Sequence, residues 1–308
     1  MFSIFLGLTP FIFITFLGFL FGRFKILDQS HAKILNLFIF YIAVPALIIK
    51  LIAQNEIGQV DLKQIFSYLI MQSICGLVAY IITFKYFKRS IPESIIWALT
   101  VALSNHVTLL LPITEIYFQQ NVISQVATII LMDGVILLSV IAFFLELSTK
   151  SNVNLFIFLK NLISNPMILS IIIGLLFVIS NFNIDETPIE YTLSKLAACV
   201  SPVGLFAIGI ILSFYTKNVI NKLSISITLL KLVISPIILL AIGFIFFNSG
   251  LPREIPGAFF VSVAPCGVTS IVLCSAYNVS PENIIKAIFV STIASIGTIF
   301  FAIQYLKI

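Results

Sequence analysis

The chain has 308 residues, of which 60% are hydrophobic and only 9% are charged. Soluble domains carry about 45–50% apolar and about 25% charged residues, so this composition excludes an ordinary soluble protein and indicates an integral membrane protein. The net charge of +5 does not indicate nucleic-acid binding, because an excess of Lys and Arg is expected in the cytoplasmic loops of a membrane protein.

The first apolar segment, FSIFLGLTPFIFITFLGFLF, has the length of ~20 residues that a spanning helix requires. No Lys or Arg precedes it and it has no small-residue cleavage site, so we expect a retained helix rather than a signal peptide. Segments of similar length follow to the end of the chain, and the polar connections between them are too short to form a soluble domain. The pattern predicts ten spanning helices, at 2–21, 33–52, 64–84, 94–118, 122–147, 157–180, 190–214, 224–247, 256–278 and 283–305.

The distribution of Lys and Arg predicts the orientation of these helices. The connections after odd-numbered helices hold eleven of the 17 basic residues, the opposite side holds five, and Lys231 lies within the eighth helix. By the positive-inside rule the odd-numbered connections are cytoplasmic. We therefore expect a multi-pass protein of the cell (inner) membrane, with both termini on the non-cytoplasmic side.

The two halves of the chain match each other at a nearly constant offset. Shifting the sequence by 156 to 160 residues pairs Pro10 with Pro166, Gly18 with Gly174, Pro45 with Pro202, Lys63 with Lys222, and Tyr117 with Tyr277. Each half holds five predicted helices, an odd number, so the two copies must have opposite orientations in the membrane. Such inverted repeats are typical of secondary transporters, whose substrate site lies where the copies meet. We expect one repeat at 1–155 and the other at 156–308.

The fourth and ninth predicted helices are both interrupted, at matching positions. The fourth contains LSNHVTLLLP, in which Pro112 removes a backbone N–H and is expected to open the helix. The ninth contains VAPCGVTSIV, in which Pro265 and Gly267 flank Cys266 at the corresponding break. One proline alone would indicate an ordinary kink. Paired breaks in the two halves instead predict a transporter binding site.

Four polar residues within the apolar segments are candidates for binding or coupling. Asn105 could bind a substrate carboxylate or hold helices together, as intramembrane amides do. His106 could take part in a proton-coupled step or remain a neutral hydrogen-bonding residue. Asp133 is unfavourable inside a membrane, so we expect it to face a partner and to couple transport to protons or sodium; a neutral acid making one structural hydrogen bond is the alternative. Lys231 could face an anionic substrate or pair with a carboxylate.

These segments resemble the auxin efflux carrier family, which includes the plant PIN-type carriers and bacterial carriers of malonate or similar carboxylates. NHVTLLLP keeps the Asn and Pro of the family's Asn-Thr-Gly-x-x-Gly-x-Pro-like segment, at Asn105 and Pro112. LNLFIFYIAVPALIIKLIA resembles the family's second helix, and APCGVTSIVLCSAYNV its ninth. The chain departs from the family pattern at His106, Val107 and Leu110, where small residues are usual.

The resemblance implies an all-α membrane fold of ten helices in two inverted repeats, with helices 4 and 9 crossing near the midplane. Helices 1, 2, 6 and 7 would form a scaffold, and helices 3–5 and 8–10 would move the substrate. It implies secondary transport of a small organic anion by alternating access. The substrate site would include residues from both breaks, namely Asn105, His106, Pro112, Pro265, Cys266 and Gly267. A homodimer is one possible assembly.

Two other functions are alternatives to an anion carrier driven by protons or sodium. No ATP-binding P-loop is present, so an ion gradient must supply the energy. A sodium-coupled symporter of the bile-acid type is the closer alternative. An intramembrane enzyme is disfavoured, because the chain has no G-x-S-x-G motif, only two histidines, and one deeply placed aspartate. We expect no enzymatic activity, no cofactor and no metal site.

Overall fold

The computed structural model describes residues 2–54, 61–149, 164–215, 218–247 and 252–307. Within these ranges the chain is helical, and its only β-type pairing is one isolated antiparallel bridge between Ser104 and Cys266. Among the described residues, seven helices are long and apolar enough to cross a membrane: Leu6–Arg23, Gln29–Ala53, Leu62–Tyr86, Gln120–Thr149, Pro188–Phe214, Lys222–Phe246 and Glu282–Leu306. The protein is therefore an all-helical integral membrane protein.

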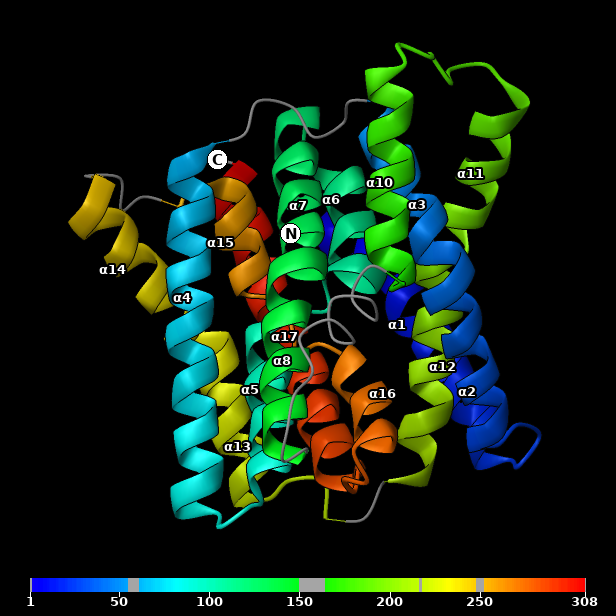
Figure 1. The fold of residues 1–308 in the computed structure, drawn as a ribbon. Helices are drawn as coiled ribbons and strands as arrows, with labels where there is room; N and C mark the ends of the chain where they lie inside the picture. Colours follow the sequence, from blue (N-terminus) through cyan, green and yellow to red (C-terminus); the bar gives the residue numbers. More distant parts are fainter. Residues whose placement is uncertain (1, 55–60, 150–163, 216–217, 248–251, 308) are drawn as a thin grey trace.

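The helices follow the predicted apolar segments in order (Figure 1), and short π-helical turns, labelled η, continue several of them. The first half contains α1 (Phe2–Arg23), α2 (Gln29–Phe38), η1 (Ile39–Ala43), α3 (Val44–Ala53), α4 (Leu62–Ile81), η2 (Ile82–Tyr86), α5 (Ile91–Ala102), η3 (His106–Leu110), α6 (Leu111–Tyr117), α7 (Gln120–Met132), η4 (Asp133–Leu137) and α8 (Leu138–Thr149).

The second half contains α10 (Pro166–Ile179), α11 (Pro188–Ala198), α12 (Val200–Phe214), α13 (Lys222–Leu229), η5 (Leu230–Ile234), α14 (Ser235–Phe247), α15 (Pro256–Ser262), α16 (Thr269–Ala276) and α17 (Glu282–Lys307). The beginning of the sixth predicted helix, at 157–163, and the boundary between residues 155 and 156 lie outside the described residues.

Short polar side chains begin many of these helices. An N-cap oxygen accepts a hydrogen bond from a backbone N–H of the first turn, which would otherwise have no partner inside the helix. In this chain Asp28, Asp61, Ser90, Asn165, Thr187 and Asn221 cap α2, α4, α5, α10, α11 and α13 in this way. The helix starts are thus specified locally by the sequence.

Two pairs of helices from opposite halves of the chain pack closely. In one pair α1 lies along α12, and in the other α3 lies along α10. A Cβ added at Gly18 would lie 2.1 Å from the carbonyl oxygen of Phe206, and one added at Gly174 would lie 2.8 Å from the Cβ of Ile52. The two glycines that the sequence offset pairs therefore have the same role, since each lets its helix approach a helix of the other half.

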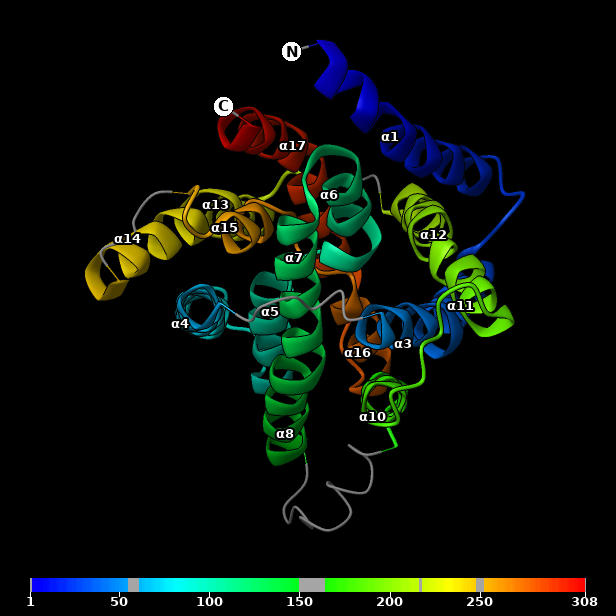
Figure 2. The ribbon, with the colours of Figure 1, turned by 90° about the horizontal axis from the view of Figure 1, so that it is seen from above.

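The helices pack in two sets that are separated in the view from above (Figure 2). One set contains α1, α2, α3, α10, α11 and α12. The other contains α4 to α8 and α13 to α17. The strongest contact between the sets is made by η3 against α12, with smaller contacts of α10 on η4 and of α1 and α12 on α17. The π-turn that follows the first break thus lies where the two sets meet.

Both predicted interruptions are confirmed, but the cause assigned to the first was wrong. The chain leaves the helix after Ala102 and resumes it at His106, and it leaves again after Ser262 and resumes at Thr269. Pro112 lies beyond the first break, in the first turn of α6. The π-turn before it widens the helix, with the N–H of Leu111 bonded to the carbonyl of His106 five residues back. This widening accommodates the proline without a break.

Candidate functional site

The two breaks cross in direct backbone contact. The Asn105 N–H donates to the Pro265 carbonyl oxygen at 3.0 Å, and the Gly267 N–H donates to the Leu103 carbonyl oxygen at 2.7 Å. These bonds flank the antiparallel bridge between Ser104 and Cys266. The unwound segments therefore satisfy part of each other's backbone, which is the condition for irregular backbone inside a membrane protein.

The last carbonyls of α5, at residues 100–103, are free of the helix but all find donors. The Gly267 N–H donates to the carbonyls of Thr100 and Leu103, at 3.3 and 2.7 Å. Lys231 Nζ donates to the Val101 carbonyl at 2.8 Å, and Gln72 Nε2 donates to the Ala102 carbonyl at 3.3 Å. The end of α5 is therefore held from three directions, by α4, by η5 and by the other break.

Lys231 is a buried cation that supports the first break. Its side chain is 1% exposed, and besides the α5 carbonyl its Nζ contacts Ser104 Oγ at 2.8 Å. Ser104 Oγ in turn donates to the Val261 carbonyl oxygen of α15 at 2.9 Å. In the described residues no carboxylate lies within 4.0 Å of Lys231 Nζ, so of its two predicted alternatives the pairing with a carboxylate is not formed in this structure. A cation here instead complements the negative end of the α5 dipole.

Asp133 is 1% exposed, and three side chains converge on its carboxylate. Gln72 Nε2 donates to Oδ1 at 2.5 Å, the Tyr68 hydroxyl donates to Oδ2 at 3.1 Å, and His106 Nε2 lies 2.8 Å from Oδ2. The expectation that this carboxylate faces a partner is confirmed, and it has three partners rather than one. Two separately predicted candidates, His106 and Asp133, thus form one buried pair.

Each of the three ionisable residues at the crossing lies in a π-helical turn. His106 begins η3, Asp133 begins η4, and Lys231 is the second residue of η5. A π-turn inserts one residue into a helix and turns a side chain out of the regular α-helical register, and such turns are frequent at functional sites. Here they direct three side chains from different helices toward the first break.

A cavity of about 90 Å³ lies beside the crossing. Its polar lining includes residues that begin η3 and α16, and the complete polar set is Asn36, Ser104, Asn105, His106, Thr108 and Thr269. The Thr108 hydroxyl donates to the Asn105 side-chain oxygen. Among the described residues His106 Nδ1 is buried without a hydrogen-bond partner. The cavity therefore combines the positive ends of two helices with the imidazole of His106.

A family model described as a membrane transport protein matches residues 3–303, which is nearly the whole chain. The chain belongs to this family. Because the family includes the auxin efflux carriers, the resemblance inferred from the two breaks is confirmed. Its members are membrane transporters rather than enzymes, in agreement with the absence of enzymatic activity expected from the sequence. No match was found among curated proteins.

The predicted substrate residues of this membrane transport protein divide into two groups. Asn105 and His106 line the cavity. Pro112, Pro265, Cys266 and Gly267 are not among the residues that line it. Cys266 is fully buried, with its N–H bonded to Ser291 Oγ at 3.2 Å, and an added Cβ at Gly267 would lie 2.8 Å from the Leu103 carbonyl oxygen. The second break therefore contributes close packing, while the first contributes polar side chains to the cavity.

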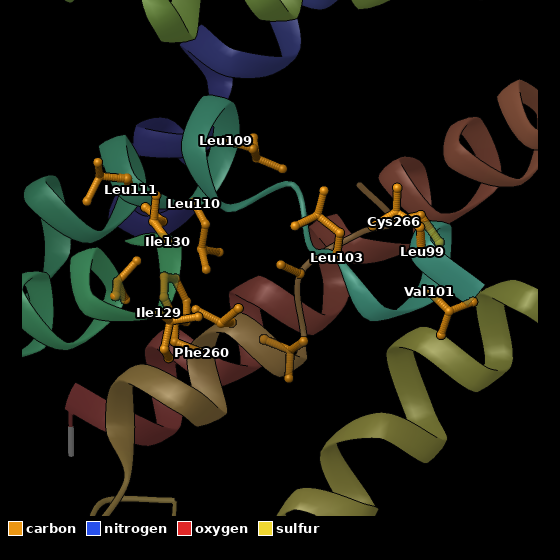
Figure 3. Close-up of a cluster of buried hydrophobic side chains, with 14 of the residues drawn as sticks. Leu99, Val101, Leu103, Leu109, Leu110, Leu111, Ile129, Ile130, Phe260 and Cys266 are labelled. Atoms are coloured by element: carbon orange, nitrogen blue, oxygen red, sulfur yellow. The ribbon is translucent and has the colours of Figure 1, made fainter. Parts of the chain in front are cut away.

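Apolar side chains enclose the crossing in this transporter (Figure 3). The chain between Leu99 and Leu103 approaches Cys266, and Leu110 lies against Ile129 and Phe260. All six are at most 5% exposed. Few waters can screen charges in such surroundings, so the hydrogen bonds to Asp133 and Lys231 are stronger than equivalent bonds at a surface.

Sequence reasoning missed Gln72, Tyr68 and Ser104, although a signal was present for one of them. Gln72 is an uncharged amide in the middle of the apolar α4 segment, where it has the same unfavourable burial as Asn105. Tyr68 lies one turn before it. Ser104 carries no comparable signal, because serine is common in membrane helices and its partners come from remote parts of the chain.

Proposed function

We propose that this protein is a secondary active transporter that moves a small organic anion across the cytoplasmic membrane by alternating access, driven by an ion gradient. The observation that supports this most strongly is the crossing of two broken helices whose second halves begin at one buried cavity. Helix N-termini carry partial positive charge and free N–H groups, which suit a carboxylate.

The cavity suits a small ligand. Its volume is about 90 Å³, and six polar residues line it. Asn105 offers its amide N–H groups to a carboxylate, held in place by the Thr108 hydroxyl on its oxygen, and Thr269 offers a hydroxyl from the first turn of α16. A short carboxylate would therefore exchange its hydration shell for amide, hydroxyl and backbone donors.

The packing supports a mechanism in which one set of helices moves against the other. Helix α1 of the first half packs on α12 of the second, and α10 of the second half packs on α3 of the first. A twofold relation between two inverted five-helix repeats requires this reciprocal packing. We assign the set of α1, α2, α3, α10, α11 and α12 as the scaffold and the remaining helices as the moving body. The main contact between the moving body and the scaffold is made by η3 on α12. Movement of this body against the scaffold could expose the crossing first to one side of the membrane and then to the other.

The accessible side of the cavity supports an orientation for this conformation. A second pocket of about 380 Å³ shares Asn36 and Phe40 with the cavity and extends to Gln29 and Lys33, at the beginning of α2. This end lies at the bottom of Figure 1, with the 87–90 connection, while the C-terminus lies at the top. Because the basic connections lie at this end, we assign it to the cytoplasm and the termini to the opposite side. In this conformation the site therefore opens inward, past Lys33.

Exchange in proteoliposomes tests the proposed function. Vesicles preloaded with unlabelled carboxylate should take up the same labelled compound without any imposed gradient, because a carrier site exchanges one molecule for another. The panel would contain lactate, pyruvate, glycolate, malonate and succinate, and each compound would also be tested for thermal stabilisation of the purified protein, since a ligand stabilises the state that it binds. Absence of both exchange and stabilisation for every compound would reject an organic-anion carrier. Hydrolysis of a lipid or peptide without transport would instead favour an intramembrane enzyme.

A further inference from the structure

We propose that the coupling ion is the proton, that the buried His106–Asp133 pair carries it, and that the co-transported anion bears a single negative charge. This inference rests on the proposed function, because it assigns the driving ion and the charge class of the substrate of the same site. It starts from the 2.8 Å contact between His106 Nε2 and Asp133 Oδ2, next to the cavity that His106 lines.

The groups around Asp133 are arranged to donate hydrogen bonds rather than to bind a metal ion. Gln72 and Tyr68 direct an amide N–H and a hydroxyl O–H at the carboxylate, and the imidazole nitrogen provides the third contact. A sodium site needs several oxygen lone pairs directed at one point, as backbone carbonyls and carboxylates supply in sodium-coupled carriers. The two nearby carbonyls freed by the break, at Val101 and Ala102, are already bonded to Lys231 and Gln72. The described residues also contain no group of three acidic, histidine or cysteine side chains able to hold a metal.

His106 can link proton binding to anion binding through its two nitrogens. In the neutral imidazole, Nε2–H donates to the ionised Asp133 and Nδ1 holds a lone pair, which explains why Nδ1 has no donor to pair with among the described residues. A proton taken up at Nδ1 turns that nitrogen into an N–H donor while the bond to Asp133 remains. The same step therefore creates a cationic donor beside the anion cavity, and the proton and the anion bind more tightly together than separately.

The charges of the site explain why neither ligand should cross alone. With Lys231 as its ammonium and Asp133 ionised, the empty site has no net charge. Adding one proton to His106 and one singly charged anion to the cavity leaves it neutral again. Either ligand by itself would leave one uncompensated charge among apolar side chains, which is unfavourable in a low-dielectric interior. A doubly charged anion would also leave the loaded site charged, so the balance selects monocarboxylates.

The other titratable groups near the pair do not change this balance. Tyr68 on α4 donates to Asp133 as a neutral phenol. Lys231 on η5 reaches the same region through Ser104, and Cys75 and Cys266 are the thiols nearest to Lys231. On the scaffold side α10 and α12, which face η4 and η3, contain no Asp, Glu, His, Lys or Arg. Among the described residues around the cavity, His106 is therefore the group that offers a ring nitrogen without a hydrogen-bond partner to a proton.

The direct test imposes gradients on proteoliposomes containing the wild-type protein and the monocarboxylate that exchanges fastest. An inward proton gradient should concentrate the labelled anion inside, by about tenfold per pH unit at equilibrium, since a tenfold ratio balances a tenfold ratio in an electroneutral one-to-one symport. A trapped pH dye should report acidification when the anion is added. A sodium gradient, or a membrane potential imposed without a pH gradient, should concentrate nothing.

His106→Gln and His31→Gln form a matched pair, because the chain has only these two histidines. The amide introduced by H106Q can still donate to Asp133 but cannot gain a proton, whereas His31 is exposed and contacts Asp28 at the start of α2. H106Q should weaken exchange, because the anion then binds without its compensating proton, and it should lose accumulation driven by the pH gradient, whereas H31Q should retain both. Thermal stabilisation by the anion should increase from about pH 8 to about pH 5.5, the range over which histidines titrate, in wild type and H31Q but not in H106Q.

Asp133→Asn gives an independent variant if H106Q does not fold. It should spare exchange but remove accumulation, because the paired anion that stabilises a protonated His106 is absent. Three outcomes would overturn the proton assignment while leaving an anion carrier in place. These are accumulation driven by sodium or by the membrane potential, exchange restricted to dicarboxylates, and full pH-driven accumulation in H106Q. Absence of exchange by every carboxylate would instead reject the proposed function and this inference with it.

Discussion

The two breaks have similar backbones but different chemistry. At the first, the carbonyls released by α5 are held by a lysine and an amide, and the chain resumes with a histidine paired to an aspartate. At the second, hydroxyls take these roles: Ser104 donates to the Val261 carbonyl, Thr298 donates to the Val263 carbonyl, and Ser291 accepts from the N–H of Cys266. Ionisable partners are therefore concentrated on one of two related segments.

Under the proposed inverted repeat, this asymmetry indicates how two copies of one segment could acquire the proposed coupled function. Two half-helix N-termini are enough to attract an anion, and both segments supply one. A site that responds to a proton also needs a group whose charge changes, and among the described residues only the first break has one within reach. The second break can then specialise in close approach, as its alanine, cysteine and glycine permit. Perturbing the two breaks separately should consequently give different results.

The largest effect is expected for Lys231→Met at the first break. The substitution leaves the Val101 carbonyl and Ser104 without their donor and Asp133 without a nearby compensating cation, so the free energy of unfolding should fall by about 3–5 kcal/mol and exchange should be lost. Denaturant or thermal unfolding of the purified protein in detergent measures the first effect. Lys222→Met, at the beginning of α13 nine residues earlier, should change stability little. An unfolding free energy of K231M within about 1 kcal/mol of wild type would contradict the bracing role.

A smaller effect is expected for Gly267→Ala at the second break. The added Cβ would lie 2.8 Å from the Leu103 carbonyl oxygen and 2.9 Å from its Cβ, so the crossing strands must separate, at a cost of about 1–3 kcal/mol. Gly297→Ala in α17 is the matched control, since nothing lies within 4 Å of its added Cβ. That substitution should stabilise the helix by up to about 1 kcal/mol. Equal unfolding free energies for the two variants would show that the crossing tolerates wider spacing.

The sequence predicted the features of this site that depend on local composition. Apolar length located the helices, and the match between the two segments indicated both breaks, although Pro112 itself lies beyond the first. The match also aligned Asn105 with Pro265, whose carbonyl accepts from the Asn105 N–H. The unfavourable burial of Asp133 and Lys231 also marked them as residues that need partners. These inferences required no knowledge of how the helices pack.

The partners themselves depend on packing that no local pattern specifies. Gln72 meets Asp133 from a position 61 residues earlier, and Lys231 meets Val101 from 130 residues later. Lys231 was predicted to face an anionic substrate or a carboxylate, whereas its Nζ contacts a backbone carbonyl released by the break and the Ser104 hydroxyl. The π-turns that orient His106, Asp133 and Lys231 were likewise not predicted, because an inserted residue leaves apolar periodicity almost unchanged over one turn.

The smallest stability change, with a large functional one, is expected for Asn105→Ala. The bond from the Asn105 N–H to Pro265 belongs to the backbone and survives the substitution, while the side chain loses its hydrogen bond with Thr108, at about 0.5–1.5 kcal/mol. Exchange should nevertheless fall at least about tenfold, since removing one hydrogen bond to a charged ligand costs about 1.5–3 kcal/mol. Asn221→Ala removes the N-cap of α13 at a similar cost of about 1 kcal/mol, remote from the cavity, and should leave exchange intact. Because the two variants lose similar stability, a loss of exchange confined to N105A would assign the amide to the anion site, and wild-type exchange in N105A would exclude it.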